Sequence, residues 1–233
     1  MEFIYADLET CASASGIVIA IDVLRAFSTA AYALQAGALS ISLVSSVEEA
    51  LFLKRAHPGW LAMGELGGLP PPGFDFGNSP TQISTLGLTD RRLIQRTSAG
   101  TQGVVRSVNA GTLLAASFVV ASATVRYAQR LNAAPTHRAH DRVTFVLTGG
   151  AQNAEDRACA EYLQALFEQR APDPQPFIQR VYAADDAIRH LDPALPEFPY
   201  EDLEACTRID AFPFAMPVTR EDGLLVLRGE NLT

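Results

Sequence analysis

The chain is poor in several residue types that mark particular classes of protein. It has one lysine, Lys54, among its 18 basic residues, one tryptophan, and three widely spaced cysteines, Cys11, Cys159 and Cys206. Without a CxxC pair, the sequence indicates neither a structural zinc site nor a disulfide framework. Free thiols are typical of a reducing cytoplasm, where we expect the protein to act. The formal net charge of −8 argues against nucleic acid or an anionic membrane as a partner.

Motifs that assign common catalytic classes are also missing. The sequence contains no Walker GK[ST], no HExxH and no GxSxG. The histidines His57, His137, His140 and His190 follow no metal-binding spacing, and we interpret all four as surface or structural residues. The longest apolar stretch, residues 112–125, is too short to span a bilayer. These absences leave a globular protein whose chemistry does not rest on histidine, cysteine or a nucleophilic serine.

What is present indicates a compact globular protein with a sizeable core. Hydrophobic residues make up 48% of the chain and charged residues 19%. Because nearly all cations are arginines, a cation that contacts an anionic ligand here is expected to be an arginine, which offers bidentate geometry to phosphate or carboxylate.

Segments with strand character alternate with segments of helical character. The run at 16–21 is continuously apolar and β-branched, which is typical of a strand buried on both faces. Further strands are predicted at 40–44, 60–63, 92–95, 118–121, 142–147 and 224–227, and helices at 27–36, 47–56, 123–131 and 155–169. The alternation predicts an α/β fold of three layers, α/β/α, with a mostly parallel mixed sheet. The segment 223–228 is expected to add a late antiparallel strand at the edge.

We interpret residues 1–233 as a single domain. Residues 17–36 and 143–167 both read as strand, acidic turn and helix. This internal similarity is expected from a duplication into two similar intertwined halves, or simply from the ordinary order of elements in α/β proteins.

The loop at 64–80 is the most informative segment. It carries five glycines and four prolines in seventeen residues, which excludes a helix or a central strand. Long ordered loops are usually functional, and this one holds Glu65, Asp75, Asn78 and Ser79, which suit a metal or an anionic substrate. The alternative is that residues 64–80 form an irregular surface loop without a role in binding.

Polar residues also follow the predicted strands, and ligands of open α/β sheets bind at the carboxyl ends of strands. Asp22 and Arg25 follow the first strand. An Asp in this place is commonly a metal ligand or a nucleophile, and Arg25 suits an anion. We set the nucleophile aside, because Leu24 stands where that mechanism usually needs a second Asp. The structural alternative is an Asp22 that caps the next helix, with Arg25 as its ion-pair partner.

Two later strand ends carry further candidates. Residues Thr97, Ser98, Gly100 and Thr101 form a small-residue turn that could cradle an oxyanion. Glu155 and Asp156 open the helix after the strand at 142–147. In the alternative reading they only complement the helix dipole. Carboxylates without histidine or cysteine suit Mg²⁺, which would neutralise a site that also accepts phosphate.

Several motifs together resemble the 2-phosphosulfolactate phosphatase family. They are Ile21-Asp22-Val23-Leu24-Arg25-Ala26, the segment GFDFGNSP at 73–80, the turn at 97–101, Glu155-Asp156 followed by Cys159-Ala160, and the late Asp210 and Pro217. The resemblance covers roughly residues 15–220 and departs from the family pattern at two positions. Leu66 stands where the family has arginine, and Ala99 where it has asparagine.

The resemblance implies a Mg²⁺-dependent phosphatase that converts 2-phosphosulfolactate to sulfolactate and phosphate in coenzyme M biosynthesis and tolerates other phosphate esters of 2-hydroxy acids. Arg25 or another arginine would hold the carboxylate or sulfonate, and Asn78, Ser79 and the 97–101 turn the rest of this small-molecule ester.

The predicted mechanism places Mg²⁺ on Asp22, Glu65 or Asp156, with Asp75 or Glu155 as the general base. The alternative is a catalytically silent module that binds a phosphorylated or dicarboxylate metabolite. The sequence leaves a homodimer open.

Overall fold

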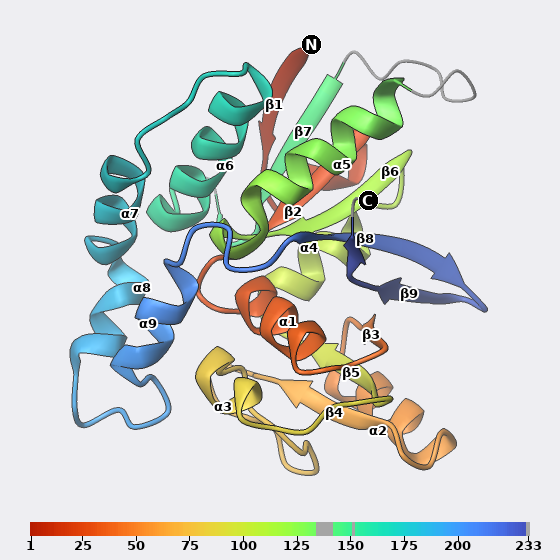
Figure 1. Ribbon diagram of the computed structural model, residues 1–233. Coiled ribbons are helices and arrows are strands. Elements are labelled where there is room, and N and C mark those ends of the chain that lie inside the picture. The colour runs from red at the N-terminus through yellow and green to blue at the C-terminus, as the bar shows by residue number, and fades with distance from the viewer. Residues whose placement is uncertain (134–141, 151, 232–233) are drawn as a thin grey trace.

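A ten-stranded mixed sheet organises the structure, a computed structural model that describes residues 1–133, 142–150 and 152–231 (Figure 1). The strands are β1 (Glu2–Ala6), β2 (Ile17–Ile21), β3 (Ser40–Leu43), β4 (Leu61–Gly64), β5 (Arg92–Arg96), β6 (Thr112–Ala116), β7 (Arg142–Leu147), β8 (Phe214–Glu221), β9 (Leu224–Leu227) and β10 (Glu230–Asn231). The helices are α1 (Ala26–Gln35), α2 (Val47–Ala56), α3 (Pro80–Ser84), α4 (Gly100–Arg106), α5 (Ala121–Ala133), α6 (Ala154–Phe167), α7 (Gln175–Tyr182), α8 (Asp185–Ile188) and α9 (Tyr200–Cys206), with 3₁₀ turns η1 (Cys11–Ser13), η2 (Phe118–Val120) and η3 (Arg189–Leu191).

The strand order is β1-β7-β2-β6-β8-β9-β3-β5-β4. The blocks β1-β7-β2-β6 and β3-β5-β4 are each parallel, and the antiparallel hairpin β8-β9 joins them. The predicted fold class, a mostly parallel mixed α/β sheet, is confirmed. The late strand β9 is antiparallel as predicted, but it lies in the middle of the sheet and not at its edge, because the second block pairs with it. The single-domain interpretation stays a prediction.

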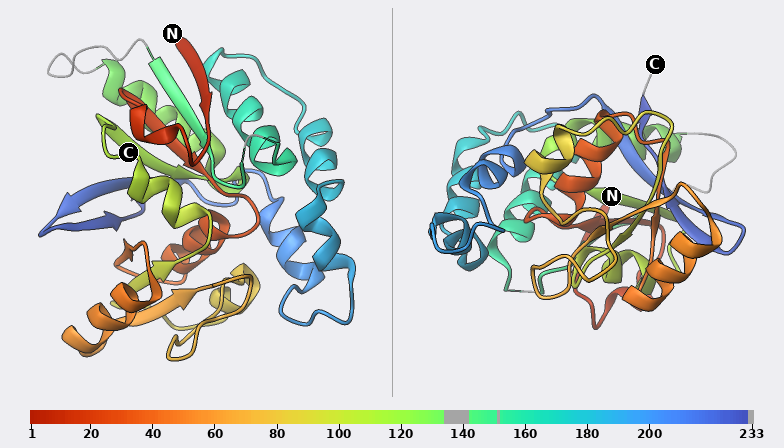
Figure 2. Two further views of the ribbon diagram at one scale, coloured as in Figure 1. Left: turned by 180° about the vertical axis from the view of Figure 1, so that it is seen from behind. Right: turned by 90° about the horizontal axis from the view of Figure 1, so that it is seen from below.

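Alternating side chains of β2 enter two different cores. Ile17, Ile19 and Ile21 pack into an apolar cluster with α5 and α6, whereas Val18 and Ala20 pack into another cluster with α1 and α4. Figure 1 shows α5 and α6 in front of this block, and the view from behind in Figure 2 shows α4 on its other face. Helices therefore cover both faces, which explains why the strand reads as a continuous apolar run. In the described part of the chain, no helix is both long and apolar enough to cross a membrane.

Four strands were not predicted from the sequence. Strands β1, β8 and β10 have no counterpart among the predicted segments, and β6 lies at 112–116 and not at 118–121. The β-branched run at 118–121 begins a helix instead, because η2 packs its side chains into both cores. Strand β8 tolerates Pro217 opposite Leu114, and the Pro217 carbonyl accepts a hydrogen bond from the Arg228 amide at 3.2 Å. Tertiary pairing here overrides local propensity.

Candidate active site

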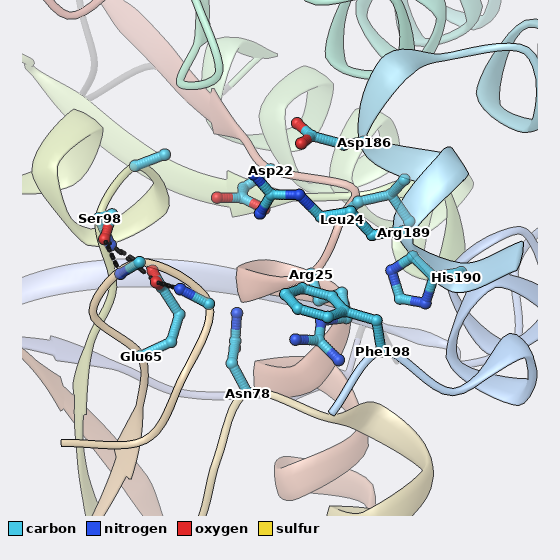
Figure 3. A pocket seen from close by; sticks show the side chains of 13 residues that line it. Asp22, Leu24, Arg25, Glu65, Asn78, Ser98, Asp186, Arg189, His190 and Phe198 are labelled. Atoms are coloured by element: carbon cyan, nitrogen blue, oxygen red, sulfur yellow. Dashed lines mark hydrogen bonds between the residues drawn. The ribbon is translucent and has the colours of Figure 1, made fainter. Parts of the chain in front are cut away.

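A cavity of about 290 Å³ lies where the ends of β2, β4 and β5 meet the C-terminal third of the chain (Figure 3). Its floor comes from the turn after β2, from the loop after β4 and from the turn after β5, and its opposite wall comes from α8, η3 and the segment that follows. The lining residues are Asp22, Leu24, Arg25, Glu65, Gly67, Gly68, Asn78, Ser98, Ala99, Asp186, Arg189, His190 and Phe198. Three strands that were predicted to end next to candidate residues, β2, β4 and β5, thus end at the same cavity.

Asp22 is the buried carboxylate of the cavity, with 6% of its surface exposed. One oxygen, Oδ1, accepts a hydrogen bond from the Ala26 amide at 2.8 Å, and Oδ2 accepts one from the Thr148 hydroxyl at 3.3 Å. Burial, together with the smaller effect of the Glu65 and Asp186 charges, raises the pKa of Asp22 to about 6. The capping alternative is correct in part, because Asp22 does accept the first amide of α1, but the acidic partner of Arg25 is a different residue.

Gly100 packs directly against Asp22. A Cβ built on Gly100 would lie 2.7 Å from Asp22 Oδ2 and 2.6 Å from the Ala26 Cβ. We expect Gly100→Ala to displace the Asp22 carboxylate, to lower turnover at this site by about tenfold or more, and to destabilise the fold by about 1–3 kcal/mol, because overpacking a tight contact strains its neighbours. Steady-state kinetics and urea unfolding measure the two effects. Gly87→Ala, where a Cβ meets no atom within 4 Å, is the control, and equal effects of the two changes would contradict the prediction.

Glu65 ties the loop after β4 to the turn after β5. Its Oε2 accepts hydrogen bonds from the Gly68 amide at 2.7 Å and the Ser98 hydroxyl at 3.1 Å, and its Oε1 accepts one from the Ser98 amide at 2.5 Å. The carboxylate therefore shapes the cavity wall, and both of its oxygens are occupied before any ligand enters.

Arg25 lines the cavity, but its charge is already neutralised. Its Nη1 donates to Asp202 Oδ2 at 2.7 Å and to the Glu197 carbonyl at 2.8 Å. The side chains of this ion pair are 4% and 0% exposed. Asp202 also accepts hydrogen bonds from the hydroxyls of Ser79 and Thr81. Arg25 and Ser79, predicted to bind substrate, therefore form a buried network that joins α9 to the floor.

Asn78 is the loop residue that remains available. It lines the cavity, is 7% exposed, and its Oδ1 has no hydrogen-bond partner among the described residues. Figure 3 shows its amide directed into the cavity. A buried amide oxygen without a partner is unfavourable, so a ligand in the cavity would satisfy it.

The turn after β5 is built by two threonines that point away from the cavity. The Thr97 amide donates to Thr101 Oγ1 at 2.9 Å, and the Thr101 amide donates to Thr97 Oγ1 at 3.0 Å. Both side chains are buried and neither lines the cavity. Of the predicted cradle, Ser98 reaches the cavity directly, and Gly100 reaches it through its contact with Asp22.

Asp156 and Glu155 lie behind the cavity. Asp156 accepts hydrogen bonds from the Val23 amide at 2.9 Å and the Gly149 amide at 3.0 Å, so it joins the ends of β2 and β7. Burial, then the charges of Asp22 and Glu155, hold the pKa of Asp156 well above its usual range. Burial, with a smaller contribution from the charge of Asp186, raises the pKa of Glu155 to about 7. Glu155 lines a neighbouring cavity that shares Asp186 with the first.

Asp75 is a further predicted residue that lies outside the cavity. Its Oδ1 pairs with Lys54 Nζ at 2.7 Å, and its Oδ2 accepts the Ala62 amide at 2.8 Å. It does not line the cavity. The pair fixes the loop to α2 and β4, so the geometry supports a structural role for Asp75 and not that of a general base.

The predicted metal ligands do not surround one point. Among residues 1–133, 142–150 and 152–231, no group of three or more histidine, cysteine or acidic side chains is arranged to hold a metal ion. Asp156 does not line the cavity, and Glu65 has both oxygens occupied. Asp22 also lines the cavity and accepts two hydrogen bonds where Glu65 accepts three, so it is the predicted ligand with more capacity for a cation.

The opposite wall was missed by the sequence analysis. Asp186, Arg189, His190 and Phe198 line the cavity, and Asp202 anchors it from behind. His190, interpreted as a surface or structural residue, lines the cavity and forms a 2.9 Å hydrogen bond through Nδ1 with the Pro199 carbonyl, and burial lowers its pKa. His137 and His140 lie outside the described residues. The only signal in the sequence was the charged run at 185–190, bracketed by proline-rich segments.

A family model and known proteins match most of this chain. The family model described as 2-phosphosulpholactate phosphatase matches residues 3–221. A probable 2-phosphosulfolactate phosphatase of Bacillus subtilis (strain 168) is 33% identical over 208 residues, which cover 89% of this chain and 88% of the relative. A protein of the same name from Carboxydothermus hydrogenoformans is 45% identical over 115 residues, 49% of this chain and 48% of the relative. The chain therefore belongs to the 2-phosphosulpholactate phosphatase family of phosphoric monoester hydrolases.

Proposed function

We propose that this protein is a Mg²⁺-dependent phosphatase that hydrolyses phosphate monoesters of 2-hydroxy carboxylic acids, 2-phosphosulfolactate among them. The family membership and the names of the relatives support the reaction. On the same proposal the enzyme acts in the cytoplasm, in a step of coenzyme M biosynthesis.

One observation supports the proposal most directly. A single small cavity is lined by a buried carboxylate, a buried amide oxygen without a partner, and a guanidinium without an acidic partner among the described residues. These belong to Asp22, Asn78 and Arg189. The guanidinium and the Asn78 amide nitrogen can donate to an anionic ester, the two oxygen acceptors suit a cation that accompanies it, and a cavity of about 290 Å³ holds a group larger than phosphate alone.

The residues present fit a magnesium ion held mainly by Asp22. The burial of Asp22 beside the Glu65 and Asp186 carboxylates disfavours its negative charge, and a cation would relieve this repulsion. Mg²⁺ usually keeps several waters and takes one or two carboxylates together with substrate phosphate, so a three-carboxylate cage is not required. When bound, the ion would polarise the phosphate and neutralise part of its charge.

The remaining chemistry is assigned to side chains of the cavity wall. Asp186 lines the cavity and accepts the proton of a water that attacks phosphorus, which forms one P–O bond while the ester P–O bond breaks. Glu155, with its pKa raised to about 7, lies behind Asp186 and keeps that carboxylate in place. Asn78 orients the phosphate: its amide nitrogen donates to an unprotonated phosphate oxygen, or its Oδ1 accepts a hydrogen bond from a protonated one. The alcohol that leaves takes its proton from solvent.

The proposal predicts metal-dependent turnover. We expect phosphate release from 2-phosphosulfolactate, 2-phospholactate and phosphoglycolate with Mg²⁺ present, and a fall to background after EDTA treatment that added Mg²⁺ reverses. The measurement is colourimetric phosphate release, with p-nitrophenyl phosphate as a non-acid ester for comparison. A rise in melting temperature with these esters but no phosphate release would instead support the catalytically silent binding module.

A further inference from the structure

Arg189 is the cation of the cavity wall that has no carboxylate to neutralise it. No ion pair involves its guanidinium within the described ranges, and its side chain is exposed at the cavity. Arg25, by contrast, is committed to Asp202. The other titratable cavity residues are Asp22, Glu65 and Asp186, which are acidic, and His190, whose pKa burial lowers. A second negative group on a ligand therefore has one available cationic partner in this cavity.

Phe198 holds Arg189 in position. The guanidinium of Arg189 lies 5.4 Å from the centroid of the Phe198 ring, and that of Arg25 lies 4.6 Å from it. His190 meets the same ring edge-on at 5.6 Å. A Cβ on Gly68 would lie 2.5 Å from the ring, so the ring is wedged against the loop after β4. Stacking on an aromatic face restrains the guanidinium and leaves its N–H groups free for a ligand.

Arg189 enters the cavity from the wall opposite Glu65 and Ser98, and in the view of Figure 3 its side chain extends toward Asp22. Figure 3 shows Glu65 and Ser98 on one side, and Asp186, Arg189 and His190 on the other. In a phosphate ester of a 2-hydroxy acid, the carboxylate and the ester oxygen share one carbon atom. A phosphate near Asp22 would therefore carry its carboxylate only a few bonds away, toward a wall residue.

We propose that Arg189 binds the carboxylate of the substrate and thereby selects phosphate esters of 2-hydroxy acids over simple alkyl phosphates. The inference rests on the proposed phosphatase function and adds a specificity-determining residue to it. A guanidinium recognises a carboxylate through two parallel N–H donors, which a methyl group in the same place cannot accept. Leu66, in the loop after β4, is apolar and 55% exposed, so that loop supplies no positive charge at this position.

The test compares two esters that differ only in this group. 2-Phospholactate carries a carboxylate where isopropyl phosphate carries a methyl group. We expect Arg189→Met to lower kcat/KM for 2-phospholactate by about tenfold to a hundredfold, mainly through KM, and to leave that for isopropyl phosphate within about twofold. Arg189→Lys should fall between wild type and Arg189→Met, because it keeps the charge but loses the fork. Arg55→Met, on the exposed face of α2, is the control and should match wild type.

Two results would overturn the assignment. Equal losses for both esters would mean that Arg189 contacts the phosphate or supports the fold, and no loss for either would mean that it does not contact substrate. If the wild type releases phosphate from neither ester, the phosphatase function fails separately. In that case lactate serves as the probe: a rise in melting temperature for wild type and Arg55→Met, but not for Arg189→Met, would still support the carboxylate site, and equal rises would contradict it.

Discussion

Asp22→Asn is expected to lower phosphate release by about a hundredfold to a thousandfold while leaving the fold intact. The change removes the negative charge proposed to hold the cation, and single electrostatic contacts of this kind have effects of that size. The amide fits the site, since its oxygen can still accept the Ala26 amide and its nitrogen can donate to the Thr148 hydroxyl, which itself donates to the Ile21 carbonyl at 2.9 Å. Phosphate-release kinetics with saturating Mg²⁺ measure the loss.

The same variant should be more stable than wild type when metal is removed. The pKa of Asp22 is raised from 3.8 to about 6, so its ionised form destabilises the folded state by about 3 kcal/mol at neutral pH. Because the pKa of Asp22 is higher in the folded than in the unfolded state, its contribution to the stability of the folded protein is fully present below the unfolded-state pKa. That contribution is lost as the pH rises through the folded-state pKa. Urea unfolding in EDTA should therefore give equal free energies of unfolding for Asp22→Asn and wild type near pH 4. As the pH rises through 6, the free energy of unfolding of Asp22→Asn should increasingly exceed that of wild type.

Asp75→Asn provides the contrast. Asp75 pairs with Lys54 outside the cavity, so we expect this variant to keep its activity. If Asp75→Asn lost activity as strongly as Asp22→Asn, the placement of the active site in this cavity would be wrong. A wild-type pH profile of stability that lacked the transition near pH 6 would contradict the electrostatic account of Asp22.

Asp202→Asn is expected to destabilise the protein more than any surface substitution, by about 3–5 kcal/mol. The change leaves Arg25 buried without an anion and places an amide N–H opposite its Nη1. For a domain of this size the loss corresponds to a fall in melting temperature of about 10 °C. Urea unfolding monitored by circular dichroism measures it. The double change Arg25→Met with Asp202→Leu should recover part of the loss, because replacing both partners removes the uncompensated charge.

The control for Asp202 is an exposed ion pair. Glu2 pairs with Arg142 at 3.0 Å, and their side chains are 60% and 49% exposed. Glu2→Gln should change the free energy of unfolding by less than about 1 kcal/mol, since solvent screens such pairs. A loss of similar size in Asp202→Asn and Glu2→Gln would show that the buried network does not hold α9 against the cavity.

Much of the local structure could be predicted from the sequence. The β-branched run of β2 indicated a strand buried on both faces, and Ser46 indicated the start of α2, where its hydroxyl accepts the Glu49 amide at 3.1 Å. Asp22, Asn78 and Ser98 were predicted site residues, and all three line the cavity. Each of these sequence patterns lies within a few residues of the structural feature that it predicts. Local steric preferences and helix capping are therefore enough to predict the feature.

The tertiary structure decided which of the candidates meet. Thr97, Thr101 and Asp156 were plausible ligands from their positions after strands, yet their hydrogen bonds are made within the scaffold. Arg25 has the right charge and place, but its partner lies 177 residues away at Asp202. Pairing at this separation depends on how the whole chain closes, which short-range patterns do not encode.

The sequence by itself determined the α/β class, the family and the floor of the cavity, because apolar periodicity and motif spacing act over a few residues. Only the tertiary structure decided the opposite wall, where Asp186, Arg189 and Phe198 come from a segment without strong local signals. It also decided that β8 and β9 run through the middle of the sheet. Both outcomes follow from long-range contacts, whose free energy is gained only when distant parts of the chain pack together.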